Sequence, residues 1–226
     1  MPPVNIWPRL REVLRDEGPG GLIIRAARKT KRAILQVERV AFYDTDLTQP
    51  FVGLRPLPVA VELIVATPDD LLNRYEATLE ADFGVEPRDV EQRLARSHIA
   101  LLGLHQGVVI SMLWLAFDAQ RVSEIGRTMV LHPGEILTYN AVTVPAWRGC
   151  GVSPHLSQFA LHFATQHGAR RHINWRRLGN ASAIRVAAKL GDRLLAVVTA
   201  VRLLGIQQPL VFGTHSAQLL PRLQCP

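Results

Sequence analysis

The sequence predicts a mixed α/β fold in which helices flank a largely central sheet. From residue 58 onward, apolar β-rich segments alternate with segments of helical periodicity, and glycines and prolines separate them. A glycine-containing loop joins a strand to a helix near residue 150. With 226 residues, 48% of them hydrophobic and 20% charged, the chain can form one sizeable core with an appendage.

The N-terminal part of the chain differs from the rest. Residues 8–15 and 22–40 have helical spacing and many arginines. The second stretch predicts a basic amphipathic helix, which could pack on the main domain or dock to an anionic membrane surface or an acidic protein. Three prolines within residues 49–58 indicate a linker. We therefore predict a basic helical N-terminal extension and linker over residues 1–57, and the main domain over residues 58–226.

The main domain is expected to open with a strand and two helices. Residues 59–66 are rich in β-formers. Thr67 has the position of an N-cap, Pro68 follows at the first helical position, and acidic residues occupy the first turn. This helix should end at Gly84, and a shorter one should follow Pro87.

A β-hairpin, an irregular connection and a further strand are expected next. Residues 98–104 and 108–117 are apolar runs on either side of a Gln-Gly turn. Residues 118–135 show no regular pattern, and residues 136–144 predict a strand that Pro145 stops.

Two helices and three strands complete the predicted domain. The helix of residues 151–167 should end before Gly168 and connect neighbouring parallel strands. A later helix should begin at Asn180 or Ser182 and end at Gly191. The remaining strands are expected at residues 171–175, 194–204 and 209–212.

Charge and cysteine content narrow the classes of partner. The net charge is +7, and most of it comes from arginine, whose planar guanidinium suits phosphates and carboxylates. The two cysteines form neither a metal-binding spacing nor a disulfide framework, which fits a reducing cytoplasm. No signal peptide, transmembrane helix or metal site is expected. We predict a cytoplasmic protein, with peripheral attachment to the inner membrane surface as an option for the N-terminal helices.

The most informative unit is a strand, a loop and a helix. The strand of residues 136–144 precedes the loop Arg148-Gly149-Cys150-Gly151-Val152-Ser153, which leads into the next helix. Glycines allow successive backbone N–H groups to point into one concavity, and the helix dipole adds positive potential there. Such a nest suits a pyrophosphate, and Arg148 adds a charge-assisted donor at its mouth.

This unit resembles motif A of the GNAT superfamily of N-acyltransferases, which reads Arg or Gln, two residues, Gly, one residue, then Gly or Ala. Here the pattern falls on Arg148, Gly151 and Ser153. Residues 180–191, which begin Asn-Ala-Ser-Ala and end Lys-Leu-Gly, resemble motif B. The two motifs cover about residues 136–192. The whole chain is also similar to GNAT members placed with polysaccharide assembly.

The resemblance implies a GNAT-type mixed sheet and an acyl-CoA-dependent N-acyltransferase. Acetyl-CoA or another acyl-CoA would be the co-substrate, and a primary amine would be the acceptor, with an amino sugar as one option. The pantetheine arm would follow the backbone of residues 141–143, and the amides of residues 149–153 would bind the pyrophosphate. The residues implied in cofactor binding are Ala141, Val142, Thr143, Arg148, Gly149, Cys150, Gly151, Val152, Ser153 and Asn180.

Three positions depart from the family pattern. Ser153 stands where motif A has Gly or Ala. Ala187 stands where many members have the tyrosine that protonates the leaving thiolate, and Asp192 replaces an aromatic residue.

The reaction needs a group that takes a proton, because only a neutral amine attacks a thioester. The candidate bases are Glu124, Glu135, His132 and Tyr139, of which Tyr139 and Glu124 rank first. Asn180 would contact the cofactor arm or help order the site. His98 is interpreted as a strand-edge residue.

Two other functions stay open at this point. The donor could be an acyl carrier protein docked by the basic N-terminal helices, in which case deletion of residues 1–57 would leave CoA-dependent activity intact. The departure at Ala187 also allows a non-catalytic CoA-binding protein. No specific nucleic-acid binding is expected, because no reading helix or aromatic RNA platform is recognisable. A homodimer is left open.

Overall fold

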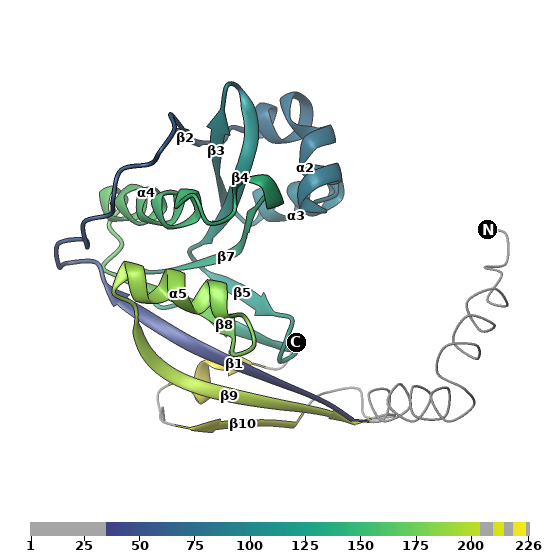
Figure 1. The fold of residues 1–226 in the computed structure, drawn as a ribbon. Coiled ribbons are helices and arrows are strands. Elements are labelled where there is room, and N and C mark those ends of the chain that lie inside the picture. Colours follow the sequence, from purple (N-terminus) through teal and green to yellow (C-terminus); the bar gives the residue numbers. More distant parts are fainter. Residues whose placement is uncertain (1–34, 204–209, 215–218, 225–226) are drawn as a thin grey trace, which may run out of the picture.

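The structure is a computed structural model that describes residues 35–203, 210–214 and 219–224. Within these residues, eight strands form one sheet in the order β10-β9-β1-β8-β7-β4-β3-β2. Neighbouring strands are antiparallel except β7 and β8, which are parallel. This mixed sheet with flanking helices confirms the predicted α/β class (Figure 1).

The strands of the large sheet are β1 (Leu35–Asp46), β2 (Glu62–Val65), β3 (Ile99–His105), β4 (Val108–Ala116), β7 (Glu135–Thr143), β8 (Arg171–Arg177), β9 (Arg193–Leu203) and β10 (Leu210–Thr214). The helices are α2 (Glu76–Phe83), α3 (Pro87–Ala95), α4 (Val152–Gln166) and α5 (Ala181–Leu190). A smaller sheet contains β5 (Ala119–Val122), β6 (Arg127–Val130) and β11 (Leu223–Gln224).

Two apolar layers hold the helices on opposite faces of the sheet. Leu79 of α2 and Val90 of α3 pack in one cluster with Trp114 of β4. Leu156 of α4 packs in the other cluster with Ile136 of β7. Because side chains alternate across a strand, each central strand supplies both layers. In Figure 1, α4 and α5 lie in front of the two halves of the sheet, and α2 and α3 lie beside the upper half.

The helix ends follow the predicted chemistry. Asp70 N–H donates to Thr67 Oγ1 over 3.1 Å, which caps the start of the first helical segment. Gly84 and Gly191 end α2 and α5 with φ of 62° and 73°, a left-handed conformation that costs glycine little. The first helical segment contains a π-helical turn, Asp70–Arg74, before α2.

The predicted helix of residues 22–40 is wrong from residue 35 onward, because residues 35–40 belong to β1. This strand pairs with β8 on one side and β9 on the other. Val40, Ala41 and Phe42 are fully buried there, so sheet packing overrides the local helical spacing. Residues 8–15 and 22–34, like Cys225, lie outside the described residues.

The predicted division at residue 57 stays a prediction, but the sheet does not follow it. β1 comes from the N-terminal side of that boundary, and it lies between two strands from the C-terminal side.

The expectation of an irregular connection over residues 118–135 is also wrong. β5 and β6 form an antiparallel hairpin there, with Ala119 opposite Val130 and Val122 opposite Arg127. Each strand has only four residues, which is too short for a period of two to stand out in the sequence.

Candidate active site

The sheet opens between its two parallel strands. In the described residues, β7 and β8 pair only from Glu135 opposite Arg171 to Leu137 opposite Ile173. Beyond this point, β7 shifts its register with β4 between Met112 and Trp114, and Asn140 adopts a left-handed φ of 49°. Such a bulge bends a strand and frees backbone groups from the ladder. The end of β7 is thereby turned away from β8.

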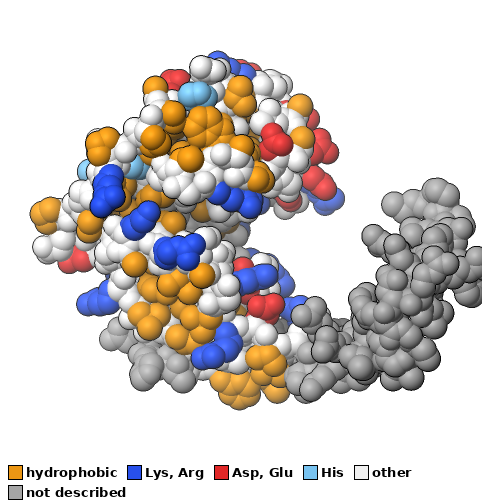
Figure 2. Space-filling view, viewed as in Figure 1, with side chains coloured by type: hydrophobic (Ala, Val, Ile, Leu, Met, Phe, Trp, Pro, Cys, Tyr) orange, Lys and Arg blue, Asp and Glu red, His pale blue; other side chains and the backbone are white. Residues whose placement is uncertain are grey.

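A cleft of about 1300 Å³ lies at this opening. Its walls come from β7, β8, α3, the β5–β6 hairpin, and the starts of α4 and α5. This volume lies above the range of about 300–1,000 Å³ found for most small-molecule pockets. Figure 2 shows the hollow between the upper and lower halves of the molecule, with Lys and Arg side chains gathered along it.

The loop before α4 forms a turn on the wall of this cleft. Gly149 and Gly151 have φ values of 82° and 89°, which L-residues rarely adopt. A Cβ added at Gly149 would meet no atom within 4 Å, so the loop faces open space there. The first N–H groups of α4 have no intrahelical acceptor, as at every helix start. Arg148 Nε donates to Thr143 O over 3.0 Å and ties the loop to the end of β7.

The residues implied in cofactor binding are brought together, with one exception. Cys150 is half-buried and does not line the cleft. Those that do line it are Ala141, Val142, Thr143, Arg148, Gly149, Gly151, Val152, Ser153 and Asn180. Their contact with CoA stays a prediction.

Tyr139 lies on β7 at the edge of the opening and is the first of three linked polar groups. Its hydroxyl is 2.7 Å from Nδ1 of His98, and Nε2 of His98 is 3.2 Å from Oδ1 of Asp118. Burial raises the pKa of Tyr139 above its ordinary value and lowers the pKa of His98. The Asp118 side chain is 56% exposed, so the chain of hydrogen bonds runs from the cleft to solvent.

His98 is a site residue that the sequence prediction missed. It is almost fully buried, with 2% of its surface exposed. Its partners Tyr139 and Asp118 are 41 and 20 positions away in the sequence. Only the pairing of β3, β4 and β7 brings them together, so no local pattern could reveal the contact.

Glu124 lies across the opening from Tyr139. Its Oε2 accepts a hydrogen bond of 3.2 Å from Trp175 Nε1, and its Oε1 is 3.5 Å from Arg177 Nε. Tyr139 and Trp175 each lie two residues beyond the last paired positions, Leu137 and Ile173. They therefore flank the opening on the same face of the sheet.

The other two candidate bases do not reach the cleft. Glu135 is buried and forms ion pairs with Arg171 over 3.1 Å and with Arg222. It also accepts the backbone N–H of His132 over 2.8 Å. Neither Glu135 nor His132 lines the cleft, and Glu135 instead ties the start of β7 to its neighbours.

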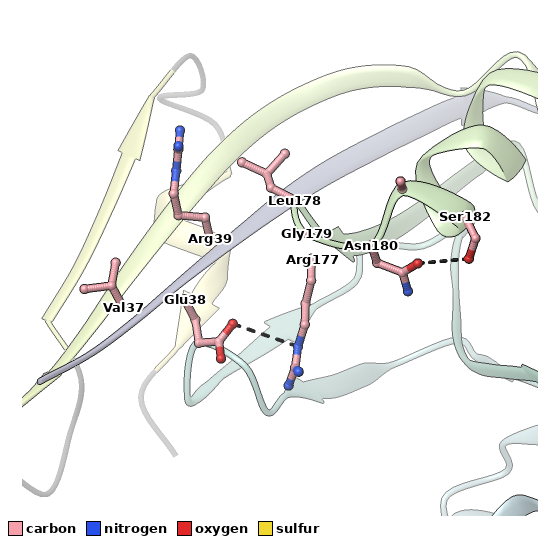
Figure 3. Close-up of a pocket in the computed structure, with 9 residues that line it drawn as sticks. Val37, Glu38, Arg39, Arg177, Leu178, Gly179, Asn180 and Ser182 are labelled. Atoms are coloured by element: carbon pink, nitrogen blue, oxygen red, sulfur yellow. Dashed lines mark hydrogen bonds and ion pairs between the residues drawn. The ribbon is translucent and has the colours of Figure 1, made fainter. Parts of the chain in front are cut away.

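Asn180 acts as the N-cap of α5. Its Oδ1 accepts hydrogen bonds from the Ala183 N–H over 3.1 Å and from Ser182 Oγ over 3.0 Å. Asn180 and Ser182 also border a groove of about 750 Å³ that continues the cleft towards β1. Glu38 and Arg177 point towards each other across this groove, 4.0 Å apart (Figure 3).

Beneath the cleft, buried polar groups link β7, β8 and the end of α5. Thr138 Oγ1 is 2.8 Å from Nε2 of His172, and Nδ1 of His172 is 3.4 Å from Nδ2 of Asn174. Asn174 donates to Asp192 over 3.0 Å, and Arg176 forms an ion pair of 3.1 Å with the same carboxylate. Asp192 therefore serves as the buried anion of this network.

Ala187, one of the positions that depart from the motif B pattern, is 1% exposed and does not line the cleft.

The charge of the cleft is strongly positive. Two acidic residues line it, Asp89 and Glu124. The basic residues that line it are Arg93, Arg96, Arg121, Arg148, Arg176, Arg177, Arg185 and Lys189. Such a surplus of positive charge attracts anionic ligands, and the walls of the cleft focus the electrostatic potential inside it.

Two other features bear on function, a metal-binding cluster and a membrane-spanning helix. Within the described ranges, no three His, Cys, Asp or Glu side chains are grouped to hold a metal ion. No helix in the described part of the chain combines the length and apolar character needed to cross a bilayer.

The fold and the cleft define an α/β protein that can accommodate a phosphorylated co-substrate at a strand–loop–helix unit and a second substrate beside it. The GNAT acetyltransferase family model matches residues 68–192, more than half of the chain. The chain belongs to the GNAT acetyltransferase family, whose members transfer an acyl group from CoA to an amine.

Solved structures show the same fold at low sequence identity. A GCN5-related N-acetyltransferase from Sphaerobacter thermophilus aligns with a TM-score of 0.55 and 14% identity, over 80% of this chain and 56% of that one. A GNAT acetyltransferase from Novosphingobium aromaticivorans aligns with a TM-score of 0.51 and 16% identity, over 74% and 64%. An acetyltransferase of the same family from Colwellia psychrerythraea gives 0.51 and 14%, over 82% and 62%. The chain thus spans about three-fifths of these relatives. No curated protein sequence matches it.

Proposed function

We propose that this chain is an acyl-CoA-dependent N-acyltransferase that moves an acetyl group from acetyl-CoA to a primary amine. The observation that carries the proposal is the cleft itself. One wall holds the glycine turn before α4, and the opposite side holds Tyr139 and Glu124. The gap between β7 and β8 joins the two parts.

The α4 and α5 side of the cleft fits the donor. The turn at Gly149 and Gly151 and the free N–H groups at the start of α4 suit a diphosphate. Arg148, Arg185 and Lys189 line this side and complement the phosphate charge. The bulged end of β7 offers backbone groups to the amide-containing arm of the co-substrate.

The other face of the opening fits the acceptor and its proton. A neutral His98 that donates Nε2–H to Asp118 accepts the phenol hydrogen of Tyr139 at Nδ1. When the amine attacks, its proton passes to the Tyr139 oxygen while the phenol proton passes to His98, and Asp118 completes the route to solvent. The C–N bond forms as the C–S bond breaks, and the released thiolate takes a proton from solvent. This route avoids a free phenolate, which the raised pKa of Tyr139 disfavours.

Glu124 adds a carboxylate oxygen that can accept a hydrogen bond from an incoming amine. Its carboxylate is held by Trp175 and Arg177, so it meets the acceptor in one fixed orientation. Among amines we propose amino sugars first, because Gln92, Gln120 and Ser123 line this side and can bind hydroxyl groups.

The test is turnover of acetyl-CoA with a panel of primary amines that includes amino sugars, followed as released thiol. Tyr139→Phe should lower kcat by about 10²- to 10⁴-fold with little change in KM, because it removes a proton relay and no binding charge. Tyr75→Phe is the matched control, since the Tyr75 hydroxyl is buried without a hydrogen-bond partner in the described structure and lies outside the cleft.

Two results would count against the proposal. Full activity of Tyr139→Phe would remove the relay from the mechanism. Calorimetric binding of CoA without turnover on any amine would favour a non-catalytic CoA-binding protein.

A further inference from the structure

We propose that the acceptor amine carries an anionic group, a carboxylate or a phosphate, and that Arg93 binds it. This inference rests on the proposed acyl transfer and names the class of its second substrate. Four arginines line the acceptor side of the cleft, on α3, directly after α3, on the β5–β6 hairpin and at the end of β8. They are Arg93, Arg96, Arg121 and Arg177.

Two of these four arginines already pair with a carboxylate of the protein. Arg96 pairs with Asp118 over 3.4 Å, and it also donates to the Ala119 carbonyl. Arg177 is shared between Glu38 and Glu124, at 4.0 and 3.5 Å. These side chains have protein partners to satisfy their charge.

Arg93 differs from them. No carboxylate of the described residues forms an ion pair with it, and its Nη1 is buried without a hydrogen-bond partner there. A buried donor that makes no hydrogen bond destabilises the folded protein, and more so if it is charged. An anion on the substrate would supply the interaction that the protein does not.

Two aromatic rings hold Arg93 in place. Its guanidinium carbon lies 4.9 Å from the centre of the Trp114 ring and 5.4 Å from that of Tyr139. Stacking of this kind occupies the face of the guanidinium and leaves its N–H edges for planar, bidentate contacts with carboxylate or phosphate. The side chain is thus oriented before a ligand arrives.

The position of Arg93 also limits the size of the acceptor. It lies against Tyr139, the residue proposed to take the proton from the amine. The anion and the amine would therefore belong to one small molecule. Arg121 lines the same side and forms no ion pair within the described chain, so it adds a second positive charge. The two acids nearby do not cancel this surplus, since Glu124 is paired with Arg177 and Asp89 is exposed.

The first test compares matched amines in the acetyl-CoA assay. Glucosamine against glucosamine 6-phosphate probes phosphate, and tyramine against tyrosine probes carboxylate. In at least one pair, the anionic member should have a kcat/KM about 10- to 100-fold higher, because a site built for an anion discriminates against the analogue that lacks it. Arg93→Gln should bring the members of that pair close to parity. Arg93→Lys should keep part of the preference, since it retains the charge and loses the planar edge.

The matched control is Arg202→Gln on β9, an exposed arginine outside the cleft, which should keep the full preference. Circular dichroism checks that each variant is folded. Even if Arg93→Gln does not fold, the wild-type pairs and Arg93→Lys still decide the question, because equal rates within both pairs overturn the proposal.

The second test does not depend on turnover. With CoA at saturation, inorganic phosphate and acetate are titrated at constant ionic strength while tryptophan fluorescence is recorded, since Trp114 lies under Arg93. Saturable binding of either anion that Arg93→Gln abolishes and Arg202→Gln retains supports the subsite. Equal binding by wild type and Arg93→Gln overturns it.

The two tests separate this inference from the proposed function. If the two members of each pair have equal kcat/KM and Arg93→Gln does not change it, the anion subsite is ruled out and the acyltransferase proposal is unaffected. Anion binding through Arg93 with no turnover on any amine leaves the subsite and removes the acyltransferase.

Discussion

His172 connects the wall of the cleft to the buried network beneath it. The imidazole is 1% exposed and is held between the Thr138 hydroxyl and the Asn174 amide. Burial lowers the pKa of His172 from 6.5 to about 4. The folded protein therefore keeps this ring neutral at pH values where the unfolded chain protonates it.

The consequence is a loss of stability in acid. Between pH 6.5 and about 4, the unfolded state binds the proton that the native state excludes, so the free energy of unfolding should fall as the pH falls. The difference between the two pKa values corresponds to at most about 3 kcal/mol. Urea unfolding at pH 7.5, 5.5 and 4.5 measures the effect.

A matched variant isolates the contribution of this histidine. His172→Gln should make the pH dependence over this range shallower, because glutamine does not titrate, and buried His98, whose pKa is also lowered, should account for part of the slope that is left. His105→Gln, at the exposed end of β3, should leave it unchanged. A slope in His172→Gln as steep as in the wild type would assign the effect to other groups.

At the residue scale, the site was predictable where its signal is local. Arg148, Gly149 and Gly151 stand within a few positions of one another, and their order before a helix predicts the glycine turn that lines the cleft. His98 and Arg93 carried no such signal. Their roles come from contacts with Tyr139 and Trp114, which depend on the register of the sheet and on the packing of α3 across it.

At the scale of the elements, the turn before α4 is the one that most strictly requires particular residues, because its backbone conformation favours glycine. Gly149→Val should weaken CoA binding at least about tenfold, because a β-branched residue at φ 82° costs on the order of 1–3 kcal/mol and the backbone would shift to relieve it. Calorimetry with CoA measures the loss. Gly53→Val is the control, since its added side chain also meets open space and Gly53 has no positive φ. Unchanged affinity in Gly149→Val would show that the turn is not part of the CoA site.

Elements with a strong local pattern agree with their predictions. The β3–β4 hairpin, α4 and α5 have clear periodicity and end at glycines or tight turns, and all are present. β1 and the β5–β6 hairpin were missed for different reasons. β1 has helical spacing but is recruited by two strands from the far end of the chain. The β5–β6 strands are too short to show alternation.

At the scale of the whole molecule, the place of β1 changes what a truncation would do. Deleting residues 1–57 was expected to leave CoA-dependent activity intact. That deletion would remove β1, expose both β8 and β9, and take Val40 and Phe42 out of the core. We now expect a protein without a cooperative unfolding transition and without CoA binding. Deleting residues 1–34 alone should preserve both properties, because the described sheet stays complete.

Thermal unfolding followed by circular dichroism, together with CoA calorimetry, separates the two truncations. A cooperative transition and normal CoA affinity after deletion of residues 1–57 would show that β1 is dispensable.

The position of β1 in the sequence also determines when this strand can pair during protein synthesis. β1 leaves the ribosome well before both of its partners, because β8 and β9 lie within residues 171–203. At ordinary rates of translation, Val40, Ala41 and Phe42 wait on the order of ten seconds for the strands that bury them. Pairing over such a sequence separation also slows folding after release. During that interval the apolar residues of β1 are exposed, and we expect a chaperone that binds the emerging chain to protect them from aggregation.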